Sequence, residues 1–150
     1  MSNLDFRSAM GCFSTGVTVV TTVERNISFG VTANSFSSVS LEPPLVLWSL
    51  SKKSKKHPIM TTAKHYIVNI LSKNQENVAL NFSKNPEPFF GIDYHLNHMG
   101  VPVIDNAVAT FECELRAVYD GGDHSIILGL VTSCKESNLE PLTFFRGKLS

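Results

Sequence analysis

The 150-residue sequence lacks three features that would each narrow its function at once: an excess of charge, a long apolar run and paired cysteines. Basic and acidic residues number 13 each, so the net formal charge is zero and no broad attraction to nucleic acid is expected. No stretch approaches the roughly 18 apolar residues that cross a bilayer, and the polar N-terminus has no signal-peptide core. The cysteines, Cys12, Cys113 and Cys134, form no CxxC pair, which favours reduced thiols and a cytoplasmic protein.

Metal sites and Rossmann-type nucleotide sites are also poorly supported. His95 and His98 have HxxH spacing, but no cysteine or acidic cluster completes a ligand set, so we expect no metal. No GxGxxG motif follows a strand, and strands do not alternate with helices as they do in a doubly wound sheet. If the protein uses a nicotinamide cofactor, that cofactor must bind by another geometry.

The sequence does contain many short β-strand patterns and few helical ones. Its length fits one domain, residues 1–150. β-Branched residues and alternating apolar positions predict strands at 17–23, 28–32, 45–50, 66–71, 107–119, 124–134 and 142–145. Helices are expected at 5–12 (with Asn3 or Asp5 as the N-cap), 58–62 and 75–82, and an irregular loop at 85–101. This pattern predicts a closed or sandwich-like β architecture.

The run from Gly30 to Leu50 is the most informative segment. A loop of small polar residues at 32–35 is followed by a hydroxyl-rich stretch, a proline pair and an apolar strand. Small polar residues let the backbone approach a planar ligand closely, and they supply hydrogen-bonding groups without charge. This combination suits an aromatic cofactor that carries a phosphate.

Further segments follow in a recognisable order: FRSAMG at 6–11, TGVTVVTT at 15–22, YIVNIL at 66–71, ATFEC at 109–113, GGDH at 121–124 and PLTFFRG at 141–147. Together with the loop at 32–35, they resemble the short-chain flavin reductases. The resemblance implies a split β-barrel of antiparallel Greek-key strands with a few short flanking helices. It also implies a homodimer with FMN or FAD in a groove at its interface.

The activity implied by the resemblance is hydride transfer from NAD(P)H to the flavin, with reduced flavin passing to a separate monooxygenase. An alternative is a flavin-binding or carrier module without efficient reductase activity. A related split-barrel oxidase acting on a phosphorylated vitamin would need a second cluster of basic residues for its substrate, and the sequence shows none.

The flavin ring is expected at Thr32, Ala33, Asn34 and Ser35, although composition alone favours a polar surface turn there. The ribityl chain and phosphate are expected at Ser49, Leu50, Ser51, Ser54 and Lys55. In this second segment, hydroxyls and an ammonium can bind an anion by charge-assisted hydrogen bonds, and a helix beginning near Ser54 would add N–H groups. The alternative for this segment is a solvated basic turn.

His124 is the expected catalytic residue, because the resemblance places it beside the flavin and the nicotinamide. An imidazole there could bond the nicotinamide amide or offset charge on the reduced flavin. The alternative is a turn histidine bonded to Asp123. Phe145 is expected to approach the flavin, and since the chain ends four residues after Arg146, no tail is expected over the nicotinamide site.

The remaining aromatic, cysteine and histidine residues are expected to have structural roles. Trp48 and Phe36 are expected to pack in the barrel or at the dimer contact, and Cys113 is expected in the core. His57 and His65, which flank the expected phosphate segment, are predicted to lie at the surface.

Overall fold

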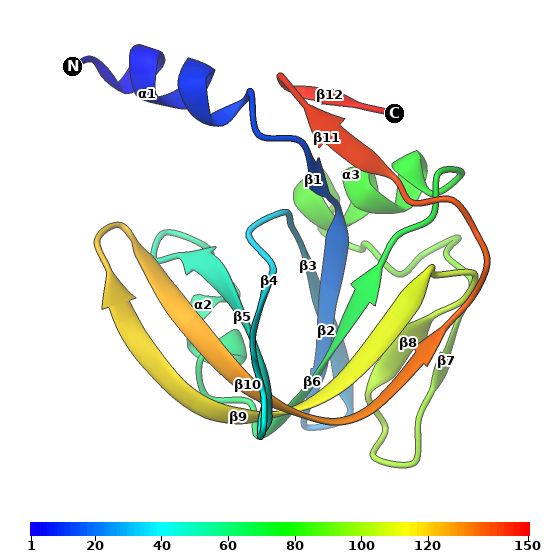
Figure 1. Cartoon of the computed structure of the whole chain (residues 1–150). Helices are drawn as coiled ribbons and strands as arrows, with labels where there is room; N and C mark the ends of the chain where they lie inside the picture. The colour runs from blue at the N-terminus through cyan, green and yellow to red at the C-terminus, as the bar shows by residue number, and fades with distance from the viewer.

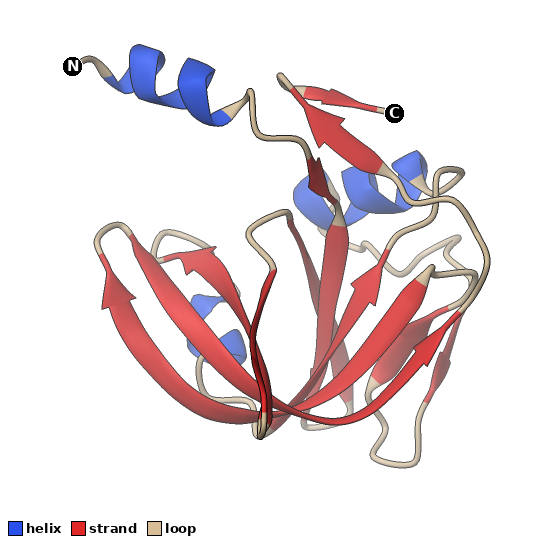
Figure 2. Ribbon diagram, in the orientation of Figure 1, coloured by secondary structure: helices blue, strands red, loops and turns tan.

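The computed structural model describes residues 1–150, and its architecture is mainly β (Figure 1, Figure 2). The main sheet has seven antiparallel strands in the order β3-β2-β6-β9-β10-β5-β4. These strands are β2 (Thr18–Glu24), β3 (Ile27–Ala33), β4 (Ser37–Leu41), β5 (Pro44–Ser51), β6 (His65–Ile70), β9 (Ala109–Gly121) and β10 (His124–Glu136). The short helices are α1 (Asn3–Met10), α2 (His57–Met60) and α3 (Glu76–Lys84). The predicted fold class is confirmed.

Two tight hairpins set the register of the sheet. Between β2 and β3, Arg25 and Asn26 have φ of 50° and 63°, as in two-residue turns whose twist matches that of the strands. Between β9 and β10, Gly122 has φ of 79°, a conformation that glycine adopts without steric cost. The second turn pairs Gly121 with His124 and so makes His124 the first residue of β10.

The sheet curves strongly, and its inner face encloses one of two cores (Figure 1). This first core contains Trp48, Tyr66 and Cys113, all with 1% exposure or less. A second core lies where the sheet meets α3 and includes Val19, Phe82 and Leu142. The edge strands β3 and β4 are not hydrogen-bonded to each other. Strand β3 is instead bonded to the segment after β5, because the Lys56 ammonium donates a hydrogen bond to the Gly30 carbonyl.

Several local expectations were wrong. The expected loop at 85–101 contains β7 (Tyr94–Leu96), which pairs with β8 (Pro102–Ile104), and the stretch at 37–41, where no element was predicted, forms the edge strand β4. Ser2, rather than Asn3 or Asp5, is the N-cap of α1, and its hydroxyl accepts a hydrogen bond from the Asp5 backbone N–H. Edge and surface elements need little burial, so their sequences carry a weak apolar pattern.

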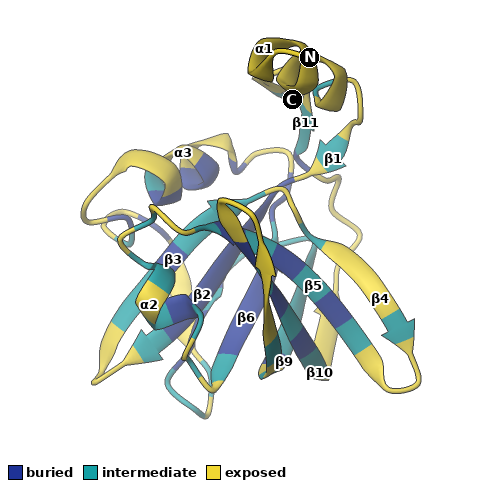
Figure 3. Ribbon diagram, turned by 90° about the vertical axis from the view of Figure 1, so that its left-hand side faces the viewer, coloured by how far each residue is buried: buried dark blue, intermediate teal, exposed yellow.

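Helix α1 projects beyond the sheet and has no buried residue (Figure 3). Its C-terminal end is held where the Arg146 N–H donates to the Gly11 carbonyl at 2.9 Å. Arg146 belongs to the turn between β11 (Thr143–Phe145) and β12 (Lys148–Leu149), which form a small sheet with β1 (Thr15–Gly16). None of the helices is long and apolar enough to cross a membrane.

Candidate functional site

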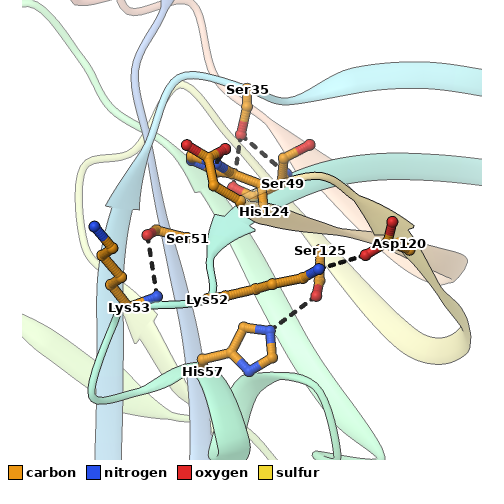
Figure 4. Close-up of polar contacts among 10 residues, drawn as sticks. Ser35, Ser49, Ser51, Lys52, Lys53, His57, Asp120, His124 and Ser125 are labelled. Atoms are coloured by element: carbon orange, nitrogen blue, oxygen red, sulfur yellow. Dashed lines mark hydrogen bonds and ion pairs between the residues drawn. The ribbon is translucent and has the colours of Figure 1, made fainter.

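The pairing of β5 with β10 brings together two predicted site segments that are far apart in the sequence. Ser51 lies opposite His124, and Ser49 lies opposite Ile126. Because side chains alternate between the faces of a strand, Ser49, Ser51 and His124 belong to the same face of the sheet. Figure 4 shows Ser35, Ser49 and His124 gathered at this end of β5.

Ser35 fixes the predicted ring loop to this end of β5. Its hydroxyl donates to the Ser49 carbonyl and accepts from the Ser49 N–H, both at 2.9 Å. Strand β4 pairs with β5 only from Ser37 and Leu47 outward, so the Ser35 hydroxyl takes the place of a strand partner for Ser49. The ring loop is therefore held beside the phosphate segment.

The predicted phosphate segment forms successive turns rather than a helix beginning near Ser54. Helix α2 begins only at His57 and spans four residues. The Ser51 hydroxyl accepts from the Lys53 N–H, and the Ser54 hydroxyl accepts from the Lys56 N–H, both at 3.2 Å. Each hydroxyl uses its acceptor side, so its own hydrogen is available for an anion.

The lysines near this segment differ in how free their ammonium groups are to bind a ligand. The Lys52 ammonium is paired with Asp120, whereas Lys55 is exposed. Lys56 is half-buried against β3, and this burial lowers the pKa of its ammonium. Lys55, the predicted phosphate ligand, and Lys53 are thus both exposed and outside any ion pair, whereas Lys52 and Lys56 are engaged.

His124 is exposed, and its Nδ1 lies 2.7 Å from Oδ1 of Asp123. This contact with His124 lowers the pKa of the Asp123 carboxyl. The bond to Asp123 expected from the structural alternative is therefore present, but it occupies Nδ1 and leaves Nε2 for a ligand. A carboxylate on one ring nitrogen sets the orientation of an imidazole, and both roles are compatible with this geometry.

Thr32 and Ala33, predicted as part of the ring loop, are instead the last two residues of strand β3. The Thr32 hydroxyl donates to the Ala79 carbonyl at 2.6 Å, and Ala33 packs against the barrel core. Asn34 is exposed, with its amide nitrogen 3.3 Å from the Thr15 hydroxyl. Thr32 and Ala33 can therefore offer a ligand little beyond their backbone, whereas the Asn34 side chain is accessible.

Two of the predicted contact residues, Leu50 and Phe145, have side chains that lie away from the groove beside the ring loop. The Leu50 side chain is 5% exposed and packs in the barrel core, so only its backbone can face a ligand. The Arg146 guanidinium carbon lies over the Phe145 ring, 5.2 Å from the ring centroid. Phe145 is not among the residues that line the groove beside the ring loop. Its neighbour Phe144 lines that groove, which has a volume of about 580 Å³ and also contains Asn34, Ser35 and Phe36.

Sequence reasoning missed the contacts that tie the phosphate segment to the β9–β10 turn. The Lys52 N–H donates to the Asp123 carbonyl at 2.9 Å, and Nε2 of His57 lies 2.9 Å from the Ser125 hydroxyl (Figure 4). His57 was expected at the surface but is half-buried, and Ser125 is buried. Only the pairing register brings these residues together, and no local pattern encodes it.

Other reactive side chains show no sign of a second site. His95 is bonded to Asp105 at 2.7 Å, and no group of His, Cys, Asp and Glu side chains could hold a metal ion. Burial raises the pKa of the Cys113 thiol to about 12, so at neutral pH it is an unreactive core residue, as expected.

Comparison with known proteins identifies a family that includes nearly the whole chain. The family described as "Flavin reductase like domain" matches residues 10–150. The chain is 45% identical to "FMN reductase (NADH) SmoA" of Agrobacterium fabrum over 95% of its length and 82% of that protein's. It is 40% identical to "Flavin-dependent monooxygenase, reductase subunit HsaB" of Mycobacterium tuberculosis, over 95% of its length and 78% of that protein's.

A solved structure agrees with this assignment. The Streptomyces globisporus NADH:FAD oxidoreductase SgcE6, solved in complex with NAD and FAD fragments, superposes with a TM-score of 0.95. It is 38% identical, and the match covers 99% of this chain and 92% of that one. In one further solved structure, with a TM-score of 0.96, the matched part is 53% of the longer chain. With its antiparallel barrel and its GGDH turn beside the ring loop, this chain belongs to the flavin reductase-like domain family.

Proposed function

We propose that this protein is an NAD(P)H:flavin oxidoreductase that uses FMN or FAD. The observation that carries the proposal is the convergence of three predicted segments on one face of the sheet: the ring loop at Ser35, the hydroxyls at Ser49 and Ser51, and His124. Two relatives that are 45% and 40% identical to the chain are named as an FMN reductase and as a monooxygenase reductase subunit.

The residues at this face fit a phosphorylated flavin. The Ser51 and Ser54 hydroxyls retain free hydrogens, and with Lys55 they would hold the phosphate by charge-assisted hydrogen bonds. Asn34 and the backbone of residues 32–35 would hold the ring, since an exposed amide can both donate and accept. When bound, the flavin supplies the ring that accepts the hydride.

The protein contributes orientation and charge control to this reaction. Asp123 holds Nδ1 of His124, which directs Nε2 of the exposed imidazole toward a ligand on the same face as Ser49 and Ser51. There it can bond the nicotinamide amide or offset charge that appears on reduction. We therefore assign His124 as the catalytic residue.

We also propose a homodimer, because the strands that carry the site have a second apolar face. Leu47 lies opposite Leu128, and Leu45 opposite Leu130, and none of the four belongs to either core. Strands that are apolar on both faces are generally covered on both. Ser49, Ser51 and His124 continue this face, so a two-fold contact through it would place each flavin beside the partner chain.

The reduced flavin is proposed to supply a separate monooxygenase. The support is that relatives include a protein named as the reductase subunit of a flavin-dependent monooxygenase. In this scheme the protein supplies reduced flavin, and the oxygenase would bind the reduced flavin after it leaves the site.

The test is to follow oxidation of NADH and NADPH by the purified protein with FMN, FAD or riboflavin added. We expect oxidation of at least one nucleotide that depends on both protein and flavin. Flavin binding without oxidation of either nucleotide would instead indicate the carrier alternative, and the absence of both would refute the assignment of this face as a flavin site.

A further inference from the structure

We propose that His57 and Ser125 are positioning residues that hold the flavin-phosphate segment at a fixed place relative to His124. The inference rests on the proposed function and deepens it. With this pair in place, binding of the flavin phosphate would raise the rate of hydride transfer and not only the affinity for the flavin.

The bond between the two residues joins the inner end of the phosphate segment to the strand that carries His124. Nε2 of His57 lies 2.9 Å from the Ser125 hydroxyl, and the Ser125 side chain is 5% exposed (Figure 4). His57 directly follows the turns of Ser54, Lys55 and Lys56, and Ser125 directly follows His124. The pair thus adds a side-chain link between the phosphate segment and β10, beyond the strand pairing of Ser51 with His124.

A second tie joins the outer end of the segment to the same hairpin. The Lys52 N–H donates to the Asp123 carbonyl at 2.9 Å, and the Lys52 ammonium pairs with Asp120. The ion pair is exposed and contributes little rigidity. Without the His57–Ser125 bond the segment would keep its ties through Lys52 and Lys56, of which Lys56 is bonded to β3 and not to β10. Its end at His57 would lose its hydrogen bond to β10 and could shift relative to His124.

This arrangement matters because hydride transfer is sensitive to position. Binding energy from a remote group of the substrate raises kcat only when it is used to orient the reacting atoms. A displacement of about 1 Å can lower a rate by about a hundredfold. A phosphate held on a segment that can shift relative to His124 would improve affinity without holding the ring in its reactive position.

The experiment compares FMN with riboflavin, which lacks the phosphate. Flavin bleaching is measured by stopped flow at saturating NADH, or at saturating NADPH if that is the donor, over a range of flavin concentrations. The proteins are the wild type, Ser125→Ala, His57→Phe and the double variant, each checked for an unchanged fold by its thermal melt. In the wild type, we expect FMN to exceed riboflavin in the maximal rate by about tenfold or more.

In either single variant, this ratio of maximal rates should fall by at least about threefold, while FMN keeps its affinity advantage over riboflavin. The double variant should resemble the worse single variant, because both changes remove the same bond. Ser125→Thr retains the hydroxyl and should restore most of the ratio. Thr22→Val is the matched control and should leave the ratio unchanged. It also removes a buried hydroxyl, which donates to the His65 carbonyl at 2.7 Å, but it lies outside the proposed site.

Failure of the inference can be told apart from failure of the proposed function. A wild type that reduces none of FMN, FAD and riboflavin would refute the function. A wild type that reduces FMN and riboflavin at equal maximal rates would overturn the inference alone. The same holds for variants that keep the wild-type ratio, or that change only flavin affinity.

Discussion

At the scale of single residues, the serine hydroxyls of the site divide into two kinds. Ser35 uses both its donor and its acceptor on the Ser49 backbone, so its role is to hold the loop. Ser51 and Ser54 use only their acceptor sides, which leaves donors for an anion. The sequence could indicate a hydroxyl-rich site, but it did not distinguish these roles. The role of Ser35 depends on where β4 ceases to pair with β5, and the roles of Ser51 and Ser54 depend on the turns that follow β5.

Ser35→Ala should therefore weaken flavin binding although its hydroxyl is not free to contact the flavin. The variant loses two hydrogen bonds worth about 0.5–1.5 kcal/mol each, so we expect flavin affinity to fall by about tenfold in a titration. Ser35→Thr should retain most of the affinity. Ser37→Ala is the control, since that hydroxyl contacts only the neighbouring Ser38 carbonyl. Unchanged affinity in Ser35→Ala would show that the loop needs no anchor.

His124→Ala should lower the rate of flavin reduction while flavin affinity changes little. The contacts of this residue are proposed to be to the nicotinamide and to charge that appears only on reduction. Loss of one such contact costs roughly 1–3 kcal/mol, or about ten- to a hundredfold in rate. Stopped-flow bleaching at saturating NAD(P)H measures it. An unchanged rate, or a variant that simply loses flavin, would leave His124 as a turn residue bonded to Asp123.

The Asp123 carboxyl should titrate below its ordinary value of 3.8, because the bond to His124 favours its charged form. A lowered folded-state pKa means that this contact stabilises the fold above the ordinary pKa. The contribution is lost as pH falls through the lowered value. NMR titration of the carboxyl in the wild type and in His124→Ala measures the effect. The midpoint should rise toward 3.8 in the variant, and an unmoved midpoint would assign the shift to another group.

At the scale of elements, the strands with strong apolar patterns were predictable and those without were not. β2, β3, β5, β6, β9 and β10 agree with their predicted positions to within a few residues. Strand β4 has three serines among its five residues and lies at an edge, and β7 and β8 are three residues each, so none of the three shows a pattern that stands out from a loop. The neighbours of β6 and β10 in the sheet depend on packing across the barrel, which no local pattern records.

One packing contact explains why β10 carries a glycine in its interior. A Cβ at Gly129 would lie 2.0 Å from the hydroxyl oxygen of Tyr66, a buried side chain of β6. Gly129→Ala should therefore lower the free energy of unfolding by about 1–3 kcal/mol, because the core must shift to accept the methyl group. Thermal or urea unfolding measures the loss. Gly16→Ala is the control, since nothing lies within 4 Å of its Cβ position, and equal effects of the two changes would contradict the packing argument.

At the scale of the whole molecule, the barrel has one apolar face that its own cores do not cover. Its inner face is filled by a core, but Leu45, Leu47, Leu128 and Leu130 form an apolar outer face that no core of this chain includes. A contiguous apolar face of this kind generally marks an interaction surface. The candidate flavin site lies at the margin of this face, so oligomeric state and flavin binding should change together.

Leu128→Glu tests this coupling. A carboxylate on this face would be buried in both copies of a two-fold contact, which is strongly unfavourable without a partner cation. We expect light scattering to give a dimer for the wild type at micromolar concentration and a monomer for the variant. Flavin affinity should fall by at least tenfold in the variant, although Leu128 belongs to none of the groups proposed to hold the cofactor. Ile27→Glu places the same charge at the β2–β3 turn, where Ile27 is 58% exposed, and should change neither property. A wild type that is monomeric and binds flavin fully would refute the shared interface. A monomeric variant with unchanged flavin affinity would show that each flavin site is complete within one chain.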